Sequence, residues 1–144
     1  MKVTKKGTID IKNKNATKKN SQKNTEKTVQ NEWFYMTPIE IKASMIAELA
    51  KESNFGEIEL WEELNILEIV LSDKSSIDFE PQRYGFQDEE DIAFVHARGI
   101  KTIFAVTLSQ CTIVSIKPFI HKLLQKWEGV FCADTLDFNP RIEK

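Results

Sequence analysis

The sequence predicts an α+β domain behind a basic tail, and three observations point to this arrangement. Apolar residues recur at helical spacing from Ile116 to Trp127. The run 76–80 alternates apolar and polar residues and follows a second apolar run across a turn. The first 32 of the 144 residues hold nine lysines and no aromatic residue. We therefore expect a tail at 1–32 and one domain at 33–144. The domain should have three helices and a sheet of about four strands, in the order α-β-β-α-β-α-β.

The tail has too few large apolar side chains to offset the entropy lost on ordering, so we expect it to be disordered. It contains nine lysines and three acidic residues, which give it a net charge of +6. Such a basic arm is suited to tether the chain to an acidic surface of the same chain or of a partner. Three consecutive aromatic residues at 33–35 mark the start of the folded domain. Met36 follows them and is an alternative start of the chain.

The first predicted helix spans 38–52, with Thr37 as N-cap, Pro38 at the first helical position and Glu40 closing a capping box. Residues 57–63 alternate like a strand, yet their composition favours a short helical turn. Residues 65–71 and 76–80 then form a β-hairpin across the turn residues 72–75. Pro81 ends the second strand of this hairpin.

Asp88 caps the second predicted helix, which ends at Gly99. Residues 100–108 are apolar on both faces, which is typical of a central strand. The third helix should begin near Ser115, because Pro118 fits best in a first helical turn, and it should end at Gly129. Residues 130–133 form the last predicted strand.

Composition excludes several classes of protein. No apolar run is long enough to span a membrane, and no signal peptide is visible at the start. Two cysteines, Cys111 and Cys132, are too few for a disulfide scaffold, so we expect a reduced, cytoplasmic protein with both thiols in the core. Residues 33–144 hold 11 basic and 19 acidic residues, a net charge of −8, which disfavours direct nucleic-acid binding. No phosphate-binding glycine loop or catalytic motif is present, so no cofactor is expected.

Candidate catalytic and metal-binding residues are few. His96 and His121 have no acidic or histidine partner at a ligand-like spacing, and we expect both to be structural or surface residues. Cys111, His121 and Cys132 are too far apart in sequence for a usual zinc site. Asp134 and Asp137 follow the last predicted strand. They suit either a pair binding a divalent cation or an Asx-type turn, and the turn is the simpler interpretation.

The acidic residues of the domain come in clusters with few basic residues between them, a pattern that steers basic partners toward a surface. Two aromatic residues in the loop between these clusters are candidate anchors. The predicted partner-binding residues are Glu62, Glu63, Asp78, Glu80, Tyr84, Phe86, Glu89 and Glu90.

Four stretches resemble small bacterial proteins of toxin–immunity systems, including contact-dependent growth inhibition. They are Ser-Ile-Asp-Phe-Glu at 76–80, Asp-Glu-Glu-Asp-Ile-Ala-Phe at 88–94, Gly-Ile-Lys at 99–101, and the run from Gly129 to Pro140. The resemblance spans over half of the chain and carries over no functional residue. It implies a cytoplasmic, non-catalytic inhibitor that binds one cognate toxin, often a basic nuclease.

The leading hypothesis is therefore a non-catalytic protein-binding module, an immunity protein that neutralises a cognate basic toxin. The first alternative is a small metal-dependent enzyme that uses Asp134 and Asp137. The second is a nucleic-acid-associated protein that acts through its basic tail.

Overall fold

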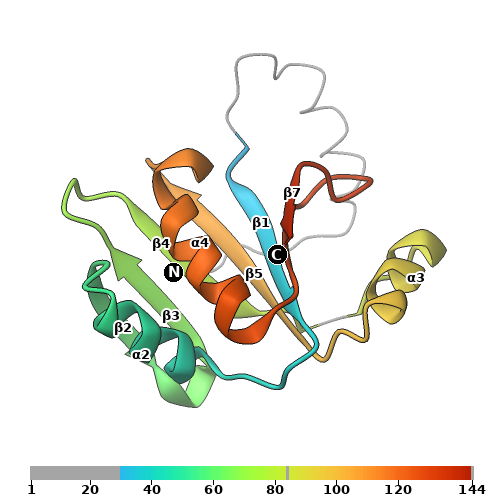
Figure 1. Ribbon diagram of the computed structural model, residues 1–144, viewed down its shortest axis with the longest axis horizontal. Coiled ribbons are helices and arrows are strands. Elements are labelled where there is room, and N and C mark those ends of the chain that lie inside the picture. The colour runs from blue at the N-terminus through green and yellow to red at the C-terminus, as the bar shows by residue number, and fades with distance from the viewer. Residues whose placement is uncertain (1–29, 84, 144) are drawn as a thin grey trace.

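The computed structural model describes residues 30–83 and 85–143, and it shows an α+β domain with three α-helices and one antiparallel sheet (Figure 1). The α+β class and the three helices confirm the prediction. The sheet has seven strands, so the expectation of about four was wrong. The strand order is β2-β3-β4-β5-β1-β6-β7. The elements in sequence order are β1 (Glu32–Thr37), α2 (Ala43–Glu52), β2 (Glu57–Trp61), the 3₁₀ turn η1 (Glu62–Leu64), β3 (Ile66–Val70), β4 (Ser76–Pro81), α3 (Glu89–Ala97), β5 (Thr102–Ser109), α4 (Ile113–Trp127), β6 (Val130–Ala133) and β7 (Arg141–Glu143).

Three of these strands, β1, β2 and β7, were not predicted from the sequence, each for a different reason. β1 is buried on both faces and therefore lacks the alternation that marks a half-exposed strand. β2 lies where the sequence analysis favoured a helical turn. Its residues alternate because it is an edge strand, with Ile58 and Leu60 packed against the main core and the residues that alternate with them exposed. β7 has three residues, too few for a pattern. The predicted strands β3, β4, β5 and β6 are present.

β1 lies near the middle of the sheet, between β5 and β6. Tyr35 and Met36 are completely buried there. A chain beginning at Met36 would lose most of this strand. The folded domain thus needs the aromatic residues 33–35, whereas the tail prediction for 1–29 lies outside the described residues.

The first helix begins later than predicted. Thr37 belongs to β1, where its side chain donates to the Trp127 carbonyl, and α2 starts only at Ala43. The Asn65 side chain accepts the Ala43 N–H at 2.7 Å. This amide oxygen, supplied by a residue distant in sequence, satisfies a donor that the helix leaves unpaired.

The third helix starts two residues before the predicted Ser115. Thr112 is its N-cap and accepts the Ser115 N–H at 3.4 Å, so Pro118 lies beyond the first turn. The other end of α4 is anchored on β1, because the Tyr35 hydroxyl donates to the Glu128 carbonyl at 2.8 Å. Gly129 follows with φ +94°, and an added Cβ would lie 2.0 Å from the Met36 carbonyl oxygen. Only glycine suits this close approach.

The two faces of the sheet are covered unequally. α2 and α4 lie side by side over one face and enclose the main core (Figure 1). On the second face, a smaller core covers only the half formed by β5, β1 and β6. In this smaller core, Phe34 of β1 and Cys132 of β6 pack with Phe94 of α3 and with Phe138, which lies in the loop between β6 and β7. We call this the covered half.

Candidate functional site

The register of the sheet aligns acidic residues from four strands on the second face. Glu59 pairs with Glu68, and Glu68 pairs with Asp78. Asp78 pairs with Thr107, which in turn pairs with Glu32. Residues directly opposite in antiparallel strands share a face, with Cβ atoms about 5 Å apart. Glu59, Glu68, Asp78 and Glu32 therefore form one transverse line, interrupted only by Thr107, which we call the acidic row.

The acidic row crosses the half of the second face that lies outside the smaller core. We call this half the open face; its residues are Glu57, Glu59, Trp61, Ile66, Glu68, Val70, Ser76, Asp78 and Glu80. No lysine or arginine occurs in strands β1 to β5. Trp61 stands opposite Ile66 and is 44% exposed, whereas Trp33 and Trp127 are buried. Tryptophan is enriched among the residues that contribute most to protein–protein binding.

The acidic surface continues from the row toward α3. The Asp134 N–H donates to the Glu32 carbonyl at 2.9 Å, which places Asp134 beside the end of the row. Burial raises the pKa of Asp91 in the first turn of α3, and the charges of Asp88, Glu90 and Asp134 raise it further. The acidic residues at the start of α3 thus adjoin those of the sheet.

The structure separates the predicted partner-binding residues into groups. Asp78 and Glu80 lie on the open face, and the exposed Glu62 and Glu63 follow Trp61 in η1. Glu89 and Glu90 are exposed in the first turn of α3, on the covered half's side of the molecule (Figure 1). These six carboxylates therefore fall into two groups, one on the open face and η1 and the other in the first turn of α3.

The two predicted aromatic anchors fare differently. Phe86 belongs to the smaller core, with its ring 5.4 Å from Phe34 and 5.5 Å from Phe138. Its contacts are structural, so it is not a freely exposed anchor. Tyr84 lies outside the described residues. Trp61, which was not among the predicted partner-binding residues, is an exposed aromatic residue of the open face.

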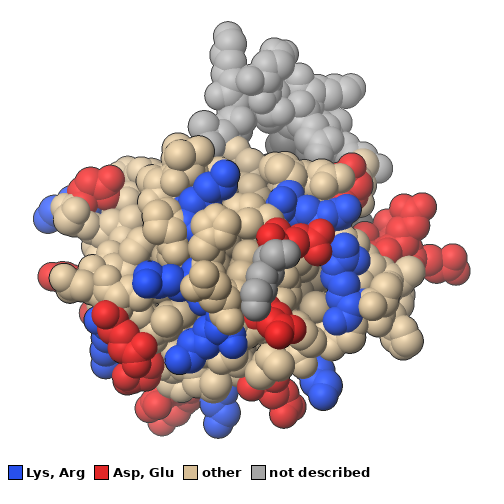
Figure 2. Space-filling model, in the orientation of Figure 1, with Lys and Arg blue, Asp and Glu red and all other residues tan. Residues whose placement is uncertain are grey.

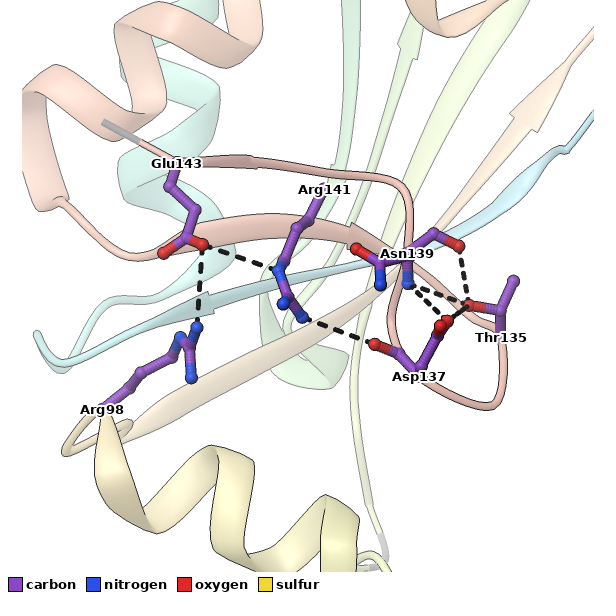
Figure 3. A network of polar contacts seen from close by, with 6 residues as sticks. All are labelled: Arg98, Thr135, Asp137, Asn139, Arg141 and Glu143. Atoms are coloured by element: carbon purple, nitrogen blue, oxygen red, sulfur yellow. Dashed lines mark hydrogen bonds and ion pairs between the residues drawn. The ribbon is translucent and has the colours of Figure 1, made fainter.

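The loop 134–140 is held by a polar network (Figure 3). Asp137 accepts the Asn139 N–H at 3.1 Å and the Thr135 hydroxyl at 3.4 Å. Hydrogen bonds from Asn139 lower the pKa of Asp137. Across the same network Glu143 lies 3.6 Å from both Arg98 and Arg141. These contacts fix the loop over the sheet, and they favour the Asx-turn interpretation of Asp137 over the cation pair.

The remaining candidate residues show no catalytic arrangement. His96 and His121 are exposed on α3 and α4. Burial raises the pKa of the Cys132 thiol to about 12, and it also raises the pKa of the half-buried Cys111. Within residues 30–83 and 85–143, no three His, Cys, Asp or Glu side chains gather in a way that suits a metal ion. In the same part of the chain, no helix has the length and apolar character to cross a bilayer.

The helix-bearing face differs in charge from the open face. Figure 2 shows Lys and Arg side chains interspersed with Asp and Glu on the side that carries α2 and α4. α4 contributes Lys117, Lys122 and Lys126. The helix-bearing face therefore carries charges of both signs, whereas strands β1 to β5 contain acidic residues and no Lys or Arg. No protein family, curated protein or solved structure matches this chain.

Proposed function

We propose that this chain is a non-catalytic binding protein that docks a basic protein partner on its open face. Its most specific form is an immunity protein that neutralises a cognate basic toxin, a role that accords with the resemblance noted in the sequence. The single observation that supports the proposal is the acidic row, because it joins Glu59, Glu68 and Asp78 on adjacent strands.

The acidic row destabilises the sheet by charge repulsion, and a basic partner would relieve this repulsion. Like charges directly opposite in a sheet destabilise it by roughly 0.2–1 kcal/mol for each pair. Lysine or arginine side chains of a partner would replace this repulsion by attraction. A field of one sign also accelerates the encounter with a basic surface. Trp61, the last residue of the edge strand β2, would then supply apolar contact area to the partner.

A nuclease is a suitable target because a nucleic-acid-binding groove is lined by basic residues. A row of carboxylates on a rigid sheet presents negative charge to such a groove, as a phosphate backbone does. Binding there would exclude the substrate without any chemistry by the inhibitor. The cytoplasm of a bacterium, where an imported toxin acts, is the proposed location.

The test is co-expression with the toxin gene next to this gene, followed by calorimetric titration of the two purified proteins. We expect the wild-type chain to abolish toxicity and bind the toxin. E59Q/E68Q and W61A should each raise Kd by at least about tenfold, the order expected for a hot-spot residue. The matched control is E48Q/E52Q, which removes two exposed carboxylates from α2 on the opposite face. The proposal fails if no neighbouring gene is toxic, or if toxicity is undiminished when this chain is present.

A further inference from the structure

We propose that residues 1–29 of this chain bind its own open face, with their lysines against the acidic row. This segment holds nine lysines and two acidic residues, Asp10 and Glu26, for a net charge of +7. The open face combines five acidic residues with the exposed Trp61 and the half-buried Ile66. The charges of the segment and the face are complementary. The proposal does not depend on the partner proposed above.

The point of attachment places the segment beside the open face. The described chain starts at Gln30, two residues before Glu32, which is the end of the acidic row. The Asn31 carbonyl accepts the Leu108 N–H at 2.8 Å, so the backbone is still held against β5 at this position. Residues 1–29 therefore join the fold at one end of the row that they are proposed to bind.

The segment is long enough to span the face. β1 and β2 are separated by four strand spacings in the sheet, which is about 19 Å at roughly 4.8 Å per spacing. Lys23 is seven residues from Gln30, a reach of about 23 Å at roughly 3.3 Å per residue. Lys27 can therefore reach the near end of the row, and Lys18, Lys19 and Lys23 can reach its far end.

Covalent linkage favours this occupant over others. A short flexible connection gives the tethered segment an effective concentration of about millimolar at the open face. At this concentration the segment can occupy the face even if each ion pair is weak. A second copy of the domain would present an equally acidic face and would be repelled. A basic partner would have to displace the segment, so the segment would discriminate against weakly bound basic proteins.

The experiment is zero-length carbodiimide cross-linking of the full chain, with mass spectrometry of the linked peptides. A mixture of isotopically labelled and unlabelled chains separates links within one chain from links between chains. We expect links within one chain from Lys18, Lys19, Lys23 and Lys27 to acidic residues of the open face. Their yield should fall at least about fivefold in 1 M NaCl, where the Debye length is about 3 Å.

A pair of variants makes the test specific. E59Q/E68Q should reduce the links to the remaining Glu57 and Glu80 by about fivefold, whereas E48Q/E52Q on α2 should leave them unchanged. Links to Glu48 and Glu52 in wild type at a comparable yield would overturn the proposal. Absence of links to the open face, or links formed mainly between different chains, would overturn it as well.

Discussion

The covered half and the open face belong to the same side of one sheet, yet they differ in chemistry. In the covered half, the side chains of β1 and β6 are apolar, and four phenylalanine residues assemble there with ring centroids 4.7–6.0 Å apart. On the open face, the corresponding positions of β2, β3 and β4 are mostly acidic. One half thus contributes to folding stability, and the other carries charge repulsion that folding alone does not require. The proposed binding of a basic partner would account for this contrast.

The largest expected effect is on the free energy of unfolding, and it is tested by replacing one aromatic residue in each half. Phe138 is 3% exposed and contacts Phe34, Phe86 and Phe94, so F138A should lower the free energy of unfolding by about 3–5 kcal/mol. Trp61 is the larger side chain but is 44% exposed, and W61A should cost less than about 1 kcal/mol. Urea unfolding of both variants measures the difference. Equal losses would mean that the two halves do not differ as described.

A smaller effect of opposite sign is expected on the open face. Glu68 has like-charged neighbours on both sides, Glu59 and Asp78, whereas Glu59 has one. E68Q should therefore stabilise the fold by about 0.5–1 kcal/mol, and E59Q by about half as much. The measurement is best made with Lys18, Lys19, Lys23 and Lys27 all replaced by Gln, so that the tail does not offset the repulsion.

Salt provides the internal check on this prediction. The gains from E68Q and E59Q should shrink in 0.5 M NaCl, because the repulsion between exposed charges is screened. E48Q on α2 removes an exposed ion pair with Lys51 at 3.9 Å and should change the unfolding free energy little at either salt concentration. A destabilising E68Q would show that Glu68 makes favourable contacts that outweigh the repulsion.

The sequence predicted the elements with clear periodicity and missed the pairing that creates the site. α4 was recognised from its apolar spacing, and the hairpin β3–β4 from its alternation and turn. The acidic row depends on register across β2, β3, β4, β5 and β1, and β1 reaches β5 from about 70 residues away in the chain. Local patterns do not specify such pairings. Asp78 was therefore predicted as an acidic partner-binding residue, but its pairing with Glu68 was not predicted.

Phe86 illustrates a second consequence of packing between segments that are distant in sequence. Its loop position next to acidic residues suggested an exposed anchor, whereas the loop folds back so that its ring packs on Phe34. The covering of β1 by this loop, α3 and residues 134–140 is a tertiary feature with no local signature. The same residues would have been assigned correctly only if β1 had been identified as a strand with two buried faces.

The smallest expected effect lies where the acidic row meets the covered half. Burial, together with Asp88, Glu90 and Asp134, raises the pKa of Asp91 above its unfolded value. The native state therefore holds this proton to higher pH than the unfolded state does, and stability falls as pH rises from the unfolded pKa through the raised one. D91N should remove this loss. It should stabilise the protein at pH 7 by less than about 1 kcal/mol, because the side chain is only partly buried and solvent screens its charge, and it should have no effect near pH 3.

Glu89 in the same helical turn supplies the matched control for Asp91. It is exposed at the first position of α3, where a negative charge interacts favourably with the helix dipole. E89Q should therefore weaken the fold slightly at pH 7, in the direction opposite to D91N. Urea unfolding of both variants at pH 3 and pH 7 distinguishes the two effects. If D91N and E89Q both destabilise the fold at pH 7, the helix dipole outweighs the burial and repulsion at Asp91, and the predicted gain from D91N is wrong.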